Sequence, residues 1–128
     1  MKITAKGCAG ALLVFVSQTQ QAQAASCWSD AAASAAAVRT FDTMLMVGTL
    51  RCRTLGHDIT PAYGRFVEHN RGLLQGANAD LRVHFDGNGG LVAFDRYVTA
   101  VANHFGAGQP GLDCNDLSDI MNRANTSR

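Results

Sequence analysis

Long apolar runs and strong net charge are both lacking in this sequence. No run of about 18 consecutive apolar residues occurs, although a transmembrane helix needs about 20. Charged residues make up 16% of the 128 residues, and the formal net charge is only +1. These absences argue against a membrane-spanning protein and against a nucleic-acid-binding protein that works by neutralising phosphates.

Lysine is also scarce, and its placement is informative. The only lysines, Lys2 and Lys6, precede an apolar stretch over residues 8–16. A polar segment then leads to Ala-Gln-Ala at residues 22–24, the small-x-small pattern of a signal-peptidase site. The sequence therefore predicts a secretory signal peptide over residues 1–24. We expect a protein of the bacterial periplasm or the extracellular space, where oxidising conditions allow disulfides to form.

Helical periodicity dominates residues 25–128, which we expect to form a single domain. Apolar residues recur at steps of three and four in four segments, and no segment shows the alternation of a half-buried strand. The predicted helices span about residues 30–54, 60–85, 91–105 and 114–124. Short breaks between them favour antiparallel neighbours. The sequence predicts an all-α fold, a compact up-down four-helix domain.

The first predicted helix has clear signals at both ends. Ser29 is placed to cap its N-terminus and Gly56 to end it. Its apolar stripe consists of Val38, Phe41, Leu45, Gly48, Cys52 and Leu55. Because further apolar residues flank this stripe, the helix is either central and buried on several sides, or it contacts a protein partner along one flank.

The second and third predicted helices follow the same periodicity. The second begins at Thr60-Pro61, a capping residue followed by a proline whose missing N–H is not needed there. Gly106 is placed to end the third. The residues expected to face the core are Tyr63, Phe66, Val67, Leu73, Leu74, Ala77, Leu81 and Phe85, then Leu91, Phe94, Val98, Val101 and Phe105.

Three cysteines remain after the predicted cleavage, so one has no partner within a monomer. An up-down bundle places Cys52 and Cys114 at the same end. Cys27 lies about 35 Å from Cys52 along the helix, whereas a disulfide needs Cα atoms within about 7 Å. We predict a Cys52–Cys114 disulfide, with two reduced, buried cysteines as the alternative. Cys27 is expected to be unpaired, as a free thiol, in a bridge to another molecule, or in exchange with Cys114.

A glycine-rich motif over residues 84–95 lies between the second and third predicted helices. Asp86, Asn88 and Asp95 match oxygen-donating positions of an EF-hand, and the motif resembles a calcium loop in those positions. It departs from that loop at His84, where the EF-hand has an aspartate. Two carboxylates are few for calcium, and Asp-Gly-Asn-Gly-Gly is typical of a tight turn. We favour the turn and keep a calcium site at Asp86, Asn88 and Asp95 as the alternative.

Recognised catalytic motifs are absent. The sequence contains no Gly-x-Ser-x-Gly elbow, phosphate loop, Cys-x-x-Cys pair or dinucleotide fingerprint. His57 in the first loop and His104 at the end of the third predicted helix would share one end of the bundle, so a hydrolase is a remote alternative. We expect no catalysis. The expected role is binding or structural interaction, with an unidentified protein or small-molecule partner.

Arginines flank one of the predicted disulfide cysteines. Arg51 and Arg53 lie on either side of Cys52, at the end of the first predicted helix. Guanidinium groups suit the planar pairing that a carboxylate offers. These two residues are therefore candidates for binding an acidic partner or a carboxylate ligand, although a solvated surface is the more common role of such arginines.

Overall fold

The computed structural model describes residues 27–127. Within this range the chain forms helices and no strands, which confirms the all-α prediction. The helices are α3 (Asp30–Thr54), α4 (Thr60–His69), α5 (Arg71–Asp86), α6 (Gly90–Phe105) and α7 (Cys114–Thr126). None of them is both long and apolar enough to cross a membrane. The predicted signal peptide lies outside the described residues.

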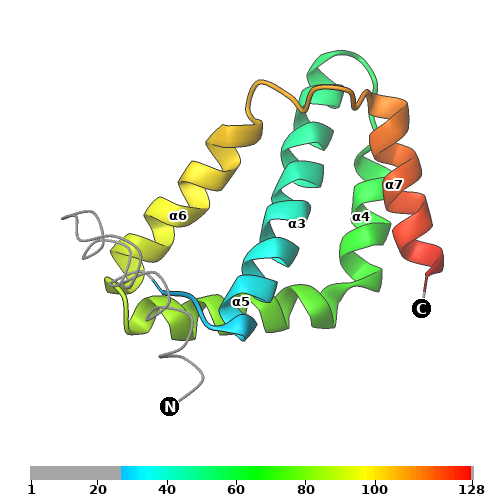
Figure 1. The fold of residues 1–128 in the computed structure, drawn as a ribbon. Helices are drawn as coiled ribbons and strands as arrows, with labels where there is room; N and C mark the ends of the chain where they lie inside the picture. Colours follow the sequence, from blue (N-terminus) through cyan, green and yellow to red (C-terminus); the bar gives the residue numbers. More distant parts are fainter. Residues whose placement is uncertain (1–26, 128) are drawn as a thin grey trace, which may run out of the picture.

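The longest helix, α3, is the centre of the arrangement (Figure 1). α4 and α7 lie along one side of it, α6 lies on the other, and α5 runs across the end at which α3 begins. α3 contacts each of these four helices. The interpretation of α3 as a central helix packed on several sides is therefore confirmed, and contact of one flank with a protein partner stays a prediction.

The predicted second helix is in fact two helices, so the four-helix prediction is corrected to five helices in residues 27–127. α4 and α5 meet at Asn70. The backbone N–H of Asn70 and its Nδ2 both donate to the carbonyl oxygen of Phe66, at 3.0 and 2.8 Å. An asparagine side chain thus competes with helix continuation, which explains the break within an uninterrupted apolar pattern. Because of it, α5 turns across the bundle.

Helix ends agree with the sequence signals in part. The Ser29 side chain accepts a hydrogen bond from the Ala32 N–H at 3.1 Å, and Gly56 has a φ of +82°, both as predicted. Thr60 does not cap α4, so that prediction is wrong. Instead, Asp58 Oδ1 accepts from the Thr60 N–H at 2.9 Å. Hydrogen bonds from Thr60 lower the pKa of the Asp58 carboxyl.

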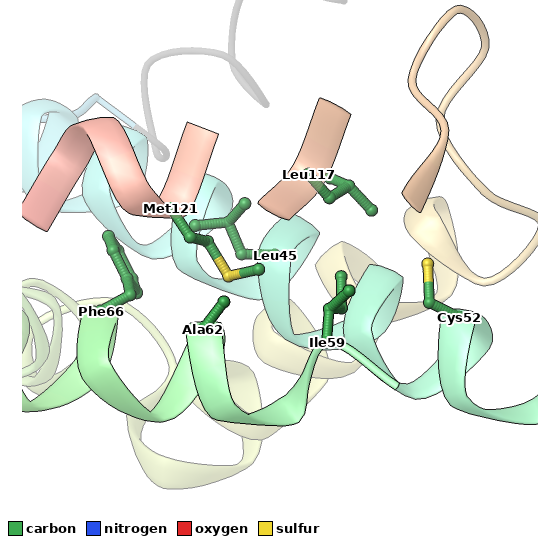
Figure 2. Close-up of a cluster of buried hydrophobic side chains, with 7 residues drawn as sticks. All are labelled: Leu45, Cys52, Ile59, Ala62, Phe66, Leu117 and Met121. Carbon is green, nitrogen blue, oxygen red and sulfur yellow. The ribbon is translucent and has the colours of Figure 1, made fainter. Parts of the chain in front are cut away.

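Two separate clusters of buried side chains form the core. The first, the disulfide-end core, joins α3, α4 and α7, and Figure 2 shows its side chains facing one another. It consists of Leu45, Cys52, Ile59, Ala62, Phe66, Leu117 and Met121. The second, the N-terminal core, joins the beginning of α3 to α5 and consists of Ala35, Ala77, Leu81 and Phe85. Leu45, Leu81 and Met121 are fully buried.

Some residues expected to face the core are exposed instead. They are Phe41, Leu55, Leu73 and Leu91. Leu55 and Leu91 lie at helix ends, where the apolar stripe continues beyond the last packed turn. Leu73 lies in the first turn of α5, directly after the break at Asn70, whereas Ala77, Leu81 and Phe85 further along α5 are buried as predicted.

Candidate functional site

A pocket lies where α3 and α6 end and α7 begins. Its volume is about 330 Å³, near the lower limit of small-molecule pockets, which span about 300–1,000 Å³. Much of its lining is apolar, with contributions from α3, α6, α7 and the segment 107–113. The apolar lining includes Met44, Phe105, Pro110, Leu112 and Leu117.

At Gly48, which lines the pocket, α3 and α7 approach each other closely. A Cβ atom added to Gly48 would lie 2.6 Å from Leu117 Cδ1, closer than side chains tolerate. Leu117 is itself buried in the disulfide-end core. Glycine at position 48 therefore lets the two helices meet at the pocket. In the sequence analysis, Gly48 was assigned to the apolar stripe only because its position fits the helical periodicity.

Cys52 and Cys114 both line the pocket. Their Sγ atoms are 2.06 Å apart, at disulfide distance, and their Cα atoms are 5.8 Å apart. The structure thus brings together the pair that sequence reasoning selected, at the end of the bundle where it was expected. The bridge links the last turn of α3 to the first residue of α7.

Cys27 is disulfide-bonded in the full-length chain, which is not the form for which an unpaired Cys27 was predicted. The prediction counted cysteines after removal of residues 1–24, whereas the full-length chain has four. For a chain cleaved after residue 24, the fate of Cys27 stays a prediction.

Arg51 supplies the positive charge at the pocket. Its Nη1 donates to the Gly106 carbonyl oxygen at 3.2 Å, which ties the end of α3 to the segment after α6. Its guanidinium also lies against Gly108, where an added Cβ would be 3.1 Å from Nε. Gly108 has a φ of +93°, so glycine suits both the backbone and the contact. Among residues 27–127, Arg51 forms no ion pair.

Asp113 supplies the negative charge at the pocket, and it is held by its own helix. Its Oδ1 accepts from the Asp116 N–H at 2.8 Å, while Asp116 Oδ2 accepts from the Asp113 N–H at 2.9 Å. This reciprocal pair is a capping box at the N-terminus of α7, where the helix dipole favours negative charge. The pocket therefore offers an apolar interior with one cation that has no acidic partner among the described residues.

The predicted calcium loop forms the turn between α5 and α6. Asn88 Nδ2 donates to the His84 carbonyl oxygen at 2.7 Å, so the side-chain amide closes the turn. Asp86 and Asp95, on α5 and α6, are both exposed. Gly89 and Gly90 have positive φ values of 93° and 68°.

These observations account for the glycine-rich pattern without an ion. At Gly89 an added Cβ would lie 2.7 Å from Ala93 Cβ, so the turn itself requires glycine there. Among residues 27–127, no group of three or more His, Cys, Asp or Glu side chains is arranged to hold a metal ion. The calcium alternative at Asp86, Asn88 and Asp95 stays a prediction that a titration can decide.

Sequence reasoning missed a buried polar cluster between α3 and α4. Asp42 is buried, and its Oδ1 accepts a hydrogen bond from the Tyr63 hydroxyl at 3.0 Å, while Arg39 Nη1 lies 3.4 Å from Oδ2. Burial, followed by the charge of Asp42, raises the pKa of Tyr63. The cluster does not line the pocket and ties two helices together. Asp42 lies three residues before Leu45, on the buried side, which is the signal that could have revealed it.

The pocket, the cysteine pair and Arg51 thus meet at one end of the molecule. None of the histidines that the sequence offers as candidate bases lines this pocket. His84 is instead stacked on Trp28, with ring centroids 4.0 Å apart. No protein-family model, curated protein or solved structure matches the chain in the comparisons.

Proposed function

We propose that this chain is an exported binding protein that holds a small, largely apolar molecule in the pocket beside Cys52 and Cys114, without catalysing a reaction. The observation that carries the proposal is the pocket itself, about 330 Å³ in volume and lined by side chains such as Met44, Phe105 and Leu117. Concave, mostly apolar sites with a few polar groups are typical of small-molecule binding.

The composition of the pocket supports binding rather than catalysis. General acid–base catalysis usually relies on a titratable group poised near neutral pH, most often histidine, and covalent catalysis needs an activated nucleophile. Among the described residues that line the pocket there is no histidine, serine or threonine. Its two cysteines are at disulfide distance, so neither presents a thiolate.

The same cysteine pair supports an oxidising location. Disulfides persist in the periplasm and outside the cell and are rare in a reducing cytosol. The predicted leader over residues 1–24 is consistent with transport to such a compartment. We therefore place the proposed binding activity in the periplasm or the extracellular space.

Titration with octanol, a neutral apolar probe, tests the proposal. We expect isothermal calorimetry to detect binding to the wild-type protein, and octanol to raise its melting temperature by mass action. Ala107→Trp places a large side chain in the pocket lining and should abolish both effects. Ala79→Trp, at an exposed position of α5 away from the pocket, is the matched control and should behave as wild type.

Two outcomes would contradict the proposed function. One is no detectable octanol binding by the wild-type protein. The other is equal octanol binding by the folded Ala107→Trp and Ala79→Trp variants, because binding would then occur outside the pocket.

A further inference from the structure

The charges of the pocket point to the chemical class of its ligand. We infer that the pocket takes a small apolar carboxylate, whose anionic group pairs with Arg51 while its hydrocarbon part lies against Met44, Phe105 and Leu117. This inference rests on the proposed function and adds a preference for one class of small molecule.

The first step is the orientation of Arg51. Its guanidinium does not turn back to the carbonyl groups at the end of α3, but reaches the segment 106–108 and donates from Nη1 to the Gly106 carbonyl oxygen. An arginine has five N–H donors, so the bond to Gly106 leaves donors for a ligand. With no acidic partner among residues 27–127, Arg51 is an uncompensated cation at an apolar pocket.

The second step is the way in which segment 106–108 holds the Arg51 guanidinium. Nε, Nη2 and Cζ would lie 3.1, 3.3 and 3.4 Å from a Cβ atom built on Gly108. These distances place the planar group against Gly108 on its Nε–Nη2 side, while Nη1 donates to Gly106, so segment 106–108 holds the guanidinium plane in position. The N–H groups at its edge point within that plane, which is the geometry for bidentate pairing with a carboxylate.

The third step is the other charge of the pocket. An anionic ligand would be disfavoured if the Asp113 carboxylate were directed freely into the cavity. Its Oδ1 is instead engaged by the Asp116 N–H, and it lies at the N-terminus of α7, whose dipole offsets its charge. Arg51 therefore determines the sign of ligand that the pocket prefers.

Three probes with the same hydrocarbon chain test the inference: octanoate, octanol and octylammonium. We expect wild-type affinity to fall in that order, with octanoate binding about tenfold more tightly than octanol, as one charge-assisted pair allows. The octanoate preference should weaken as the salt concentration rises, because Arg51 is exposed.

Arg51→Gln and Arg53→Gln form a matched pair of variants. Both arginines are exposed in the last turn of α3, but only Arg51 lines the pocket. Arg51→Gln should remove the roughly tenfold preference for octanoate, so that octanoate and octanol bind the variant with equal affinity. Arg53→Gln should retain the wild-type order of the three probes.

The outcomes separate this inference from the proposed function. Absence of octanol binding in the wild-type protein removes the proposed function. If the wild-type protein binds octanol and octanoate with equal affinity, the carboxylate preference is overturned while the proposed function stands. An equal loss of octanoate affinity in both arginine variants has the same meaning. If segment 106–108 moves in Arg51→Gln and the variant no longer binds octanol, the order of the three affinities in the wild-type protein decides whether the pocket prefers a carboxylate.

Discussion

The two halves of α3 build cores of different kinds. The C-terminal half packs Leu45 with large side chains such as Met121 of α7, and it is tied covalently to α7. The N-terminal half is rich in alanine, and Ala35 packs with Ala77 and Leu81 of α5. Small side chains allow helix axes to approach closely, whereas large ones fill volume at a greater separation. The pocket adjoins the covalently tied half, where the cysteine pair fixes the helix ends around it.

Removal of the disulfide tests the importance of the covalent link that only the disulfide-end core has. We expect this change to reduce the free energy of unfolding more than any other change proposed below. Replacing both cysteines, C52A with C114A, should lower the free energy of unfolding by about 4 kcal/mol, the chain-entropy value for a 62-residue separation. Urea unfolding of the double variant and the wild type measures the difference. A loss below about 1 kcal/mol would show that the disulfide-end core does not depend on its covalent tie.

Truncation of one fully buried leucine in each core compares their packing directly. Leu45→Ala and Leu81→Ala should each cost about 3 kcal/mol, because both side chains have no exposed surface. Hydrogen exchange should locate the two effects differently. We expect faster exchange in α4 and α7 for Leu45→Ala, and in α5 and α6 for Leu81→Ala. The same exchange pattern in both variants would mean that the two clusters behave as one core.

The tyrosines of the two regions differ in the hydrogen bonding of their hydroxyl groups. Tyr63 donates to Asp42, whereas the buried Tyr97 hydroxyl has no hydrogen-bond partner among the described residues. Tyr63→Phe should cost about 1 kcal/mol at neutral pH, and Tyr97→Phe should be neutral or stabilising. Thermal melting of the two variants measures this contrast, and an equal loss in both would contradict the hydrogen-bond assignment.

The raised pKa of Tyr63 also predicts a dependence on alkaline pH. The folded protein holds the phenol proton more tightly than the unfolded chain, whose tyrosines ionise near pH 10, about their ordinary value. The stabilisation is therefore complete below about pH 10 and declines as the pH rises above it. Tyr63→Phe should make this decline shallower, while Tyr97→Phe serves as the control.

Calcium should have the smallest effect. The Asn88 amide is used to close the α5–α6 turn, and Asp86 and Asp95 are exposed. We expect about millimolar calcium to leave the melting temperature unchanged, since a ligand stabilises only when its concentration exceeds its dissociation constant. An upward shift that disappears in Asp86→Asn would instead establish the calcium site.

The proximity of residues far apart in the sequence was predictable where it depended only on the directions of the helices. Cys52 and Cys114 were expected at one end of the bundle because helices alternate in direction, and α5 lies across the opposite end without changing that relation. The break at Asn70 was not predictable from periodicity, because it depends on a local bond between a side chain and a backbone carbonyl.

The pocket itself could not be predicted from the pattern of apolar residues. Its shape depends on the contact of Arg51 with Gly106, which are 55 residues apart in the sequence. The sequence did nominate Arg51 as a candidate for carboxylate binding, together with Arg53. The structure separates these two residues, since only Arg51 lines the pocket.

The most direct test of the account is the location of a bound ligand by NMR. Amide and methyl shifts recorded during an octanoate titration compare the two regions in one experiment. The account predicts saturating shifts at Met44, Phe105 and Leu117, beside the cysteine pair, and none at Ala35 or Leu81 in the N-terminal core. Shifts centred on the N-terminal core, or none at all, would contradict it.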